Sequence, residues 1–333
     1  ASGPVRTTST DMDSGNTVVY STAETPQSSY TADVKASYDE YSDMAIVVIT
    51  RQGGEGADMP RSMKGADGAR EESDHFLQLD KNETDLLAAV CNGPFEKVVV
   101  LLNIASVMEA GFLTDPDYYA YQENIDAALW IGYPGNTGTL GVCNILNGNV
   151  NPSGRTVDTW SADFKADPTW NNFGESQPGY DELRVNGSGS GYYFVDYEES
   201  VYVGYKYYET RGFDENRAGN ESWYDDNAIY PFGYGLSYTD FVWEVDDSSV
   251  RNVTIDGHQK YEITVTVTNT GDVAGKDGVE LYAHAPYYYF GIEKPYVTLV
   301  DFAKTPLIEP GKSMPVTLTF DPYYLASYDY NDA

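Results

Sequence analysis

Residues Lys97–Asn103 read KVVVLLN, an unbroken apolar run with the length of one β-strand. Similar runs occur at Met44–Ile49 (MAIVVI) and at Ala127–Ile131 (AALWI). Continuous apolar runs are typical of parallel strands covered on both faces, whereas a strand with one face in water alternates apolar and polar residues. The three runs therefore predict neighbouring strands of a mostly parallel sheet.

Helices are predicted between and after these runs. Asp80, followed three residues later by Glu83, has the spacing of a capping box, and apolar residues up to Val90 form one helical face. A second helix is predicted over Thr139–Leu146, closed by the glycine of Asn147–Asn149. Alternating strands and helices indicate an α/β layer.

From about Phe241 the apolar period becomes two. Glu262–Thr268 alternates cleanly, and Gly278–Tyr282 and Pro315–Phe320 repeat the pattern, with the turn sequences NTGD and EPGK between them. Short alternating strands of this kind predict an antiparallel β-sandwich of immunoglobulin-like type. The stretch over residues 160–240 has neither period and is predicted to be long, irregular and surface-running.

The chain is strongly acidic. Its 333 residues include 52 acidic and 20 basic side chains, a formal net charge of −32. Such a chain repels nucleic acid and anionic lipid, so neither is an expected partner. The sequence contains no run of about 20 apolar residues, the length that a membrane-spanning helix needs. The charge fits a solvated surface, with a saline or acidic habitat as the alternative. The 30 tyrosines suit either sugar binding or sandwich cores and loops.

Cysteines and histidines predict no metal site. Cys91 and Cys143 fall in predicted helices among apolar neighbours, so both are expected to be buried free thiols. No paired CxxC and no HExxH occurs. His75, His258 and His284 stand far apart and are expected to be structural or surface-exposed.

A glycine-rich loop follows the first predicted strand, with Glu55 between two glycines in Thr50–Asp58 (TRQGGEGAD). In open α/β sheets ligands bind beyond the carboxyl ends of the strands, and glycines let a ligand approach closely. From the loop alone, Glu55 is either a site carboxylate or a solvated charge. A dinucleotide-binding loop would need GxGxxG opening a helix, and Pro60 interrupts that.

Several stretches, in one order, resemble segments of glycoside hydrolase family 3 β-glucosidases. They are GEGAD at 54–58, VVVLLN at 98–103, NVNPSGR at 149–155, YVGYKYY at 202–208, PFGYGLSYTDF at 231–241, VTNTGD at 267–272 and LIEPG at 307–311. The similarity runs from about residue 40 to the end, and PFGYGLSYTDF is the most specific stretch.

The resemblance implies an α/β sandwich domain over residues 1–215, a connector over 216–240, and a fibronectin type III-like β-sandwich over 241–333. The first domain, short compared with relatives, is expected to be incomplete at its N-terminus. The resemblance makes Glu55 the general acid/base of a retaining β-glycosidase. Met59, where many relatives have arginine, is expected to contact substrate. Four residues are expected to support the loop: Arg51, Gly54, Gly56 and Asp58.

The resemblance also implies a partner. In the family the nucleophilic aspartate lies on a (β/α)8 barrel domain, which needs about 250 residues and does not fit here. We therefore expect a barrel domain or chain of the same secreted enzyme as partner, a β-glucoside or oligosaccharide as substrate, and no cofactor. A homodimer is also possible from the sequence. The alternative function is a non-catalytic sugar-binding or scaffold module of the same fold. Trp130, Trp223 and Tyr234 either line a sugar site or pack in the interior.

Overall fold

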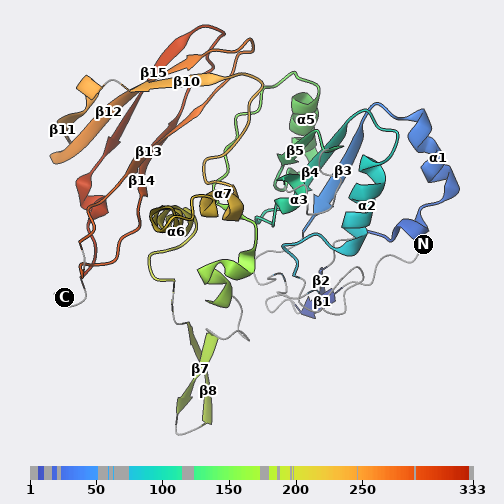
Figure 1. The fold of residues 1–333 in the computed structure, drawn as a ribbon, viewed down its shortest axis with the longest axis horizontal. Coiled ribbons are helices and arrows are strands. Elements are labelled where there is room, and N and C mark those ends of the chain that lie inside the picture. Colours follow the sequence, from blue (N-terminus) through green and yellow to red (C-terminus); the bar gives the residue numbers. More distant parts are fainter. Residues whose placement is uncertain are drawn as a thin grey trace. The chain divides into compact units, whose positions relative to one another are not determined.

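The computed structural model describes residues 7–10, 17–20, 24–51, 59, 63, 75–114, 124–172, 180–185, 188–195, 197, 199–245, 247–288 and 290–329. The chain divides into two compact units, Ala1–Val142 and Cys143–Ala333 (Figure 1). The predicted domain boundaries at residues 215 and 240 stay predictions.

The first unit holds a parallel three-stranded sheet. Its strands β3 (Ala45–Thr50), β4 (Val98–Asn103) and β5 (Ala127–Trp130) follow one another in space in chain order. The predicted parallel sheet is therefore confirmed. The remaining elements are a hairpin of β1 (Thr7–Thr10) and β2 (Thr17–Tyr20), the helices α1 (Ala32–Glu40), α2 (Lys81–Cys91) and α3 (Gly111–Thr114), and the 3-10 turn η1 (Gln27–Ser29).

Burial differs between the central and the edge strand. The first five residues of β4 are all buried, as its continuous apolar run predicts. In β3, Val47 and Ile49 are buried, but Ile46 and Val48 are each 49% exposed. The prediction that these runs are covered on both faces is wrong for β3 and for β5, whose first two residues are exposed and whose others are half-buried. Both are edge strands of the described sheet, and the described elements do not cover both of their faces.

Helix α2 begins at the predicted capping box. The Asp80 side chain accepts a hydrogen bond from the Glu83 N–H at 2.7 Å, and the Glu83 carboxylate accepts one from the Asp80 N–H at 2.9 Å. These bonds satisfy amide groups that a helix N-terminus would otherwise leave unpaired. Helix α5 (Gly135–Leu146) is also confirmed, starting four residues before the predicted Thr139.

The two thiols are free, but only one is buried. Cys91 is buried at the end of α2, as predicted, whereas Cys143 on α5 is exposed. The prediction for Cys143 is wrong because its side of the helix is not covered by described residues. Leu140, one helical turn before it, is 68% exposed, and α5 has no buried residue.

The second unit begins with elements that the sequence did not predict. They are β6 (Trp160–Ser161) paired with β9 (Ala228–Tyr230), the hairpin of β7 (Tyr180–Val185) and β8 (Ser188–Val195), the helices α6 (Tyr205–Ala218) and α7 (Trp223–Asn227), and the 3-10 turns η3 (Phe164–Ala166) and η4 (Pro168–Asn172). The prediction of an irregular stretch is therefore wrong here. In α6 only Tyr208 and Gly212 are buried, so its sequence shows no apolar stripe.

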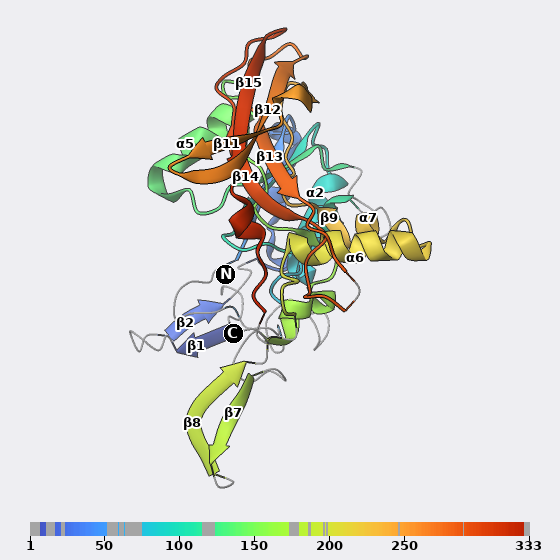
Figure 2. The same cartoon turned by 90° about the vertical axis from the view of Figure 1, so that its left-hand side faces the viewer.

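The rest of this unit is an antiparallel two-sheet structure (Figure 2). One sheet consists of β10 (Phe241–Val245), β12 (His258–Asn269), β11 (Arg251–Ile255) and β15 (Ser313–Phe320), and the other of β13 (Gly278–Ala283) and β14 (Thr298–Lys304). Short 3-10 turns lie at η5 (Asp247–Ser249) and η6 (Pro322–Leu325). Both sheets contribute to one core: Val265, Val267, Val279, Ile308, Val316 and Leu318. The predicted antiparallel architecture is confirmed.

The NPSGR and PFGYG segments are bonded to this two-sheet structure. Arg155 donates to the Gly235 carbonyl at 2.7 Å and to Asp277 at 2.5 Å, and Trp243 donates to the same carboxylate at 2.7 Å. Gly235 lies so close to this region that an added Cβ would stand 2.4 Å from the Gly154 carbonyl oxygen. The two-sheet structure is thus joined to the preceding segments by partly buried polar contacts as well as by the chain.

Candidate functional site at the carboxyl edge of the parallel sheet

The carboxyl ends of the three parallel strands are tied together by side-chain hydrogen bonds. Asn103 donates to the Gly132 carbonyl at 2.5 Å, Trp130 to the Ile104 carbonyl at 2.7 Å, and the Tyr133 hydroxyl to the Arg51 carbonyl at 2.8 Å. The first two bonds join the last residue of one strand to the segment after another, and the third joins the segments that follow β5 and β3. This edge, where open α/β sheets bind ligands, is therefore held rigidly.

Arg51, the first residue after β3, makes several buried contacts at this edge. It is 2% exposed, and all five of its guanidinium N–H donors have partners. It donates to Glu83 twice, at 2.6 and 2.9 Å, to the Thr50 carbonyl at 2.7 Å, and to the carbonyls of Phe76 and Gln78. We call these contacts the Arg51 network. It connects the end of β3, the segment before α2 and the first turn of α2.

Glu83 is the acidic member of the Arg51 network. Its carboxylate serves both the guanidinium and the capping box, so it fixes Arg51 relative to the α2 axis. Burial raises the pKa of the Glu83 carboxyl above its ordinary value, and the charge of Arg51 opposes that shift. The pair is therefore sensitive to loss of the arginine, which is the main group that opposes the effect of burial on the Glu83 pKa.

A second buried pair holds the same segment from the other side. His75 Nε2 lies 3.0 Å from Glu109 Oε1, and both side chains are buried. The Glu109 N–H also donates to the Leu77 carbonyl at 2.7 Å. Residues 75–79 are thus fixed both to the end of β3 and to the segment after β4. His75 is structural, as the sequence analysis expected among its alternatives.

The predicted site residues divide into described and undescribed ones. Arg51 lies as above, and Met59 is half-buried. Four predicted residues lie outside the described ones: Gly54, Glu55, Gly56 and Asp58. Sequence reasoning placed Glu83 in the capping box but not beside Arg51, and it missed Tyr133 and Glu109, because nothing local in the sequence signals their long-range partners.

The described contacts of three aromatic residues fit packing. Trp130 donates its indole N–H to a backbone carbonyl, and the Trp223 ring lies 6.4 Å from the Tyr208 ring. The Tyr234 ring lies 4.8 Å from that of Tyr230. These contacts favour packing for the half-buried Trp130 and Trp223, whereas Tyr234 packs on Tyr230 and stays 38% exposed.

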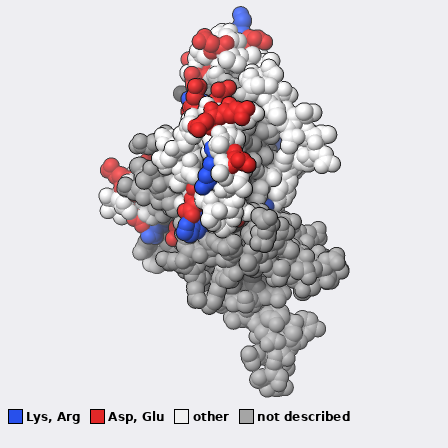
Figure 3. Space-filling view, turned by 90° about the vertical axis from the view of Figure 1, so that its right-hand side faces the viewer, with Lys and Arg blue, Asp and Glu red and all other residues white. Residues whose placement is uncertain are grey.

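No group of three or more His, Cys, Asp or Glu side chains in the described part of the chain has the arrangement of a metal site. No helix among the described residues is long and apolar enough to cross a membrane. Acidic side chains outnumber basic ones over the described part of the face in Figure 3.

Comparison with known proteins identifies the family. The family described as "Glycosyl hydrolase family 3 C-terminal domain" matches residues 7–238, about 70% of the chain. The chain belongs to glycosyl hydrolase family 3. The matched region of this family 3 chain contains the whole carboxyl edge of the parallel sheet and the PFGYGLSY stretch. The family resemblance inferred from the sequence is thereby confirmed.

Named relatives of the family 3 chain agree. β-Glucosidase A of Butyrivibrio fibrisolvens is 31% identical over 325 residues, which cover 89% of this chain and 34% of that protein. The β-glucosidase of Ruminococcus albus is 31% identical over 87% of this chain and 25% of its own length. The chain thus spans about a third or less of the length of these relatives.

Solved structures of β-glucosidases share the fold. The enzyme of Paenibacillus barengoltzii is 33% identical, with a TM-score of 0.68 over 92% of this chain and 28% of its own. β-Glucosidase 3B of Thermotoga neapolitana is 30% identical, with a TM-score of 0.67 over 92% of this chain and 36% of its own. The similarity therefore extends over both compact units.

Proposed function

We propose that this family 3 chain supplies the acid/base part of a retaining, exo-acting β-glycosidase that hydrolyses terminal non-reducing β-D-glucosyl residues. The observation that carries the proposal is the family match over residues 7–238, which include Glu55 and its glycine-rich loop. The named relatives are β-glucosidases, which supports a β-glucoside as substrate. The enzyme is proposed to be secreted and to need no cofactor.

The proposed chemistry is a double displacement. Two carboxyl groups about 5–5.5 Å apart are required, one as nucleophile and one as acid and then base. Glu55 is assigned the second role: it protonates the departing oxygen, and its carboxylate then takes a proton from the attacking water. The nucleophilic aspartate is assigned to a (β/α)8 barrel domain or chain of the same enzyme, outside these 333 residues. The antiparallel two-sheet structure is proposed to be fibronectin type III-like.

The described part of the site supports this proposal through the Arg51 network. Glu55 lies in the sequence between Arg51 and His75, and both of these residues are held by buried contacts. A catalytic acid must be kept close to its productive position, because small displacements cost large factors in rate. We assign Arg51 and Glu83 the role of positioning residues that fix the start of this segment and its return toward α2.

The test uses the complete enzyme with Glu55→Ala. Substrates whose leaving group needs protonation should react about 10²–10⁴-fold more slowly. An activated aryl glucoside should lose far less in its first step, and azide should speed its turnover and give a β-glycosyl azide. Asp58→Ala is the matched control and should show neither leaving-group dependence nor azide rescue.

Two outcomes would oppose the proposal. Equal slowing of activated and unactivated substrates, with no azide effect, would remove Glu55 from the acid/base role. A complete protein without hydrolytic activity on any β-glycoside would favour the non-catalytic sugar-binding or scaffold alternative.

A further inference from the structure

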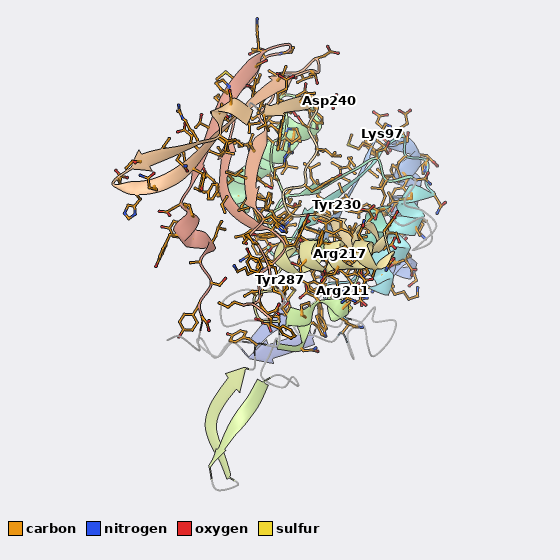
Figure 4. The ribbon with its side chains drawn as sticks, turned by 60° about the vertical axis from the view of Figure 1, so that its left-hand side comes forward. Lys97, Arg211, Arg217, Tyr230, Asp240 and Tyr287 are labelled. Atoms are coloured by element: carbon orange, nitrogen blue, oxygen red, sulfur yellow. The ribbon has the colours of Figure 1, made fainter. Side chains whose placement is uncertain are left out.

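The connection between β13 and β14 exposes a group of aromatic side chains. Its sequence from Pro286 to Glu293 is PYYYFGIE, here called the aromatic loop. Tyr287 is 50% exposed, Tyr288 74% and Phe290 94%. Figure 4 labels Tyr287 on this loop, with Arg211 and Arg217 on α6. Exposed aromatic side chains grouped this closely mark an interaction site more often than scattered single ones do.

The residues that flank the aromatic loop are fixed to α6. The Tyr296 ring stacks on Phe213 with centroids 4.1 Å apart, and the Tyr296 N–H donates to the Thr210 hydroxyl at 2.8 Å. The Leu299 N–H donates to the Tyr205 hydroxyl at 2.9 Å. The loop is therefore carried on an anchored base, which lowers the entropic cost of binding a ligand.

The backbone at Phe290 is strained. Its φ of +66° lies in the left-handed region, which a bulky side chain adopts at a cost of about 1–3 kcal/mol. Its ring gains little from burial in return, because it is almost fully exposed. Strain that points a large apolar ring into water motivates a functional explanation.

Polar groups beside the rings are arranged for a hydroxyl-rich ligand. Glu293 accepts hydrogen bonds from Tyr202 and, at 3.2 Å, from Tyr287. A phenol that donates to a carboxylate keeps lone pairs that can accept from another hydroxyl. Rings with such phenolic oxygens suit a flat molecule with apolar faces and a hydroxyl rim, which is the chemistry of a sugar chain.

Net charge decides between possible occupants. Two copies of a chain with a formal charge of −32 repel each other, and an anionic polymer would be repelled as well. A neutral ligand carries no such penalty. We infer that the aromatic loop, with Tyr287, Tyr288 and Phe290, is a binding site for a neutral β-linked glucan chain. The choice of a β-glucan rests on the proposed function.

The test is affinity electrophoresis of the complete enzyme in native gels that contain soluble mixed-linkage β-glucan. The wild type should be retarded, and Tyr288→Ala/Phe290→Ala should weaken the derived affinity by about tenfold, as for loss of two anchoring aromatic residues. The matched control is Tyr323→Ala/Tyr324→Ala, which removes two rings of similar exposure, 77% and 80%, from η6. It should bind as the wild type does, and both variants should keep the wild-type kcat/KM on a small aryl β-glucoside.

Other results would overturn the inference. Equal retardation of the wild type and the loop variant, or no retardation of the wild type, would exclude glucan binding at this loop. A dimeric wild type with a monomeric loop variant would assign the loop to a second copy. If the loop variant bound glucan as the wild type does but melted at a lower temperature, the aromatic loop would instead pack against another part of the enzyme. Glucan binding in the gel needs no catalytic turnover. A negative result in the Glu55 experiment would therefore not change the interpretation of this binding test.

Discussion

The Arg51 network predicts that Arg51 and Glu83 act as a coupled pair. In Arg51→Met, Glu83 would remain buried without its cation, and the Phe76 and Gln78 carbonyls would lose their donor. Removing one partner of a buried pair costs about 3–5 kcal/mol. The two carbonyls without a donor add a further cost. We therefore expect the local free energy of unfolding to fall by about 5 kcal/mol, the upper end of that range.

The double variant Arg51→Met/Glu83→Gln should recover much of the loss. It leaves no uncompensated charge, and the amide oxygen introduced by Glu83→Gln can still accept from the Asp80 N–H. Breaking a buried pair is costly mainly because a single charge stays behind, whereas removing both charges is far less so. We therefore expect a coupling free energy of about 2 kcal/mol or more between the two sites.

The effect of Arg51→Met should also depend on pH. Burial already raises the pKa of Glu83, and loss of the opposing cation raises it further. The folded state then holds a proton that the unfolded state releases above a pKa of about 4.3. Stability of the variant is thus greatest below that pH and falls as pH rises toward the folded-state pKa. The deficit relative to the wild type should be smaller at pH 5 than at pH 8.

Amide hydrogen exchange read by mass spectrometry suits this test, because a chain with two units need not unfold in one step. Peptides from α2 and β4 should lose protection, while peptides from β12 and β15 should not change. Lys97→Met is the matched control, since it breaks the exposed pair with Asp126 and should leave α2 protection nearly unchanged. Additive losses in the double variant, or unchanged α2 protection in Arg51→Met, would refute the reasoning.

Three further predictions follow from burial and hydrogen bonding. At pH 8 the folded protein should react with one equivalent of a thiol reagent, at exposed Cys143, because burial raises the pKa of Cys91 to about 11; two equivalents would contradict this. Above about pH 10 the free energy of unfolding should fall, because burial raises the pKa of Tyr208 and the folded state keeps a proton that the unfolded phenol releases. Tyr208→Phe should make that pH dependence less steep, and an unchanged slope would exclude Tyr208 as its source. Residues 241–333 expressed alone should melt at a lower temperature than the same sheets in the intact chain, because the shortened chain lacks Arg155, the partner of Asp277. Equal melting temperatures by circular dichroism would contradict this.

The sequence predicted those parts of the fold that depend on local patterns. The apolar runs at β3, β4 and β5 and the capping box of α2 needed only neighbouring residues, and all are present. The alternating strands of the second unit follow from period two in the same way. These predictions succeed because the same few residues determine both the element and its burial pattern.

Other features depend on partners far along the chain. Arg51 and Glu83 are 32 residues apart, and although the sequence placed one after a strand and the other in a capping box, nothing local indicates that they bind each other. Helix α6 buries two residues only, so its periodicity gives no signal. Exposure of Cys143 depends on what covers α5, which its apolar neighbours do not specify. The role proposed for Glu55 rests on family resemblance, since a glycine-rich loop by itself is compatible with several functions.

The tyrosine content has a physical explanation in the contacts of the described residues. With 52 acidic and 20 basic side chains, there are too few cations to pair one-to-one with the carboxylates. Tyrosine hydroxyls donate to carboxylates in several places: Tyr30 to Glu24 at 2.7 Å, Tyr208 to Asp167 at 3.1 Å, Tyr224 to Glu209 at 2.5 Å and Tyr282 to Glu280 at 2.7 Å. A phenol satisfies a partly buried carboxylate with a charge-assisted bond and packs its ring at the same time. Tyrosine thereby takes over, in this acidic chain, part of the role that arginine has at the carboxyl edge of the sheet. The same pairing at Tyr202, Tyr287 and Glu293 places phenolic oxygens beside the aromatic loop, where they can accept hydrogen bonds from a neutral ligand.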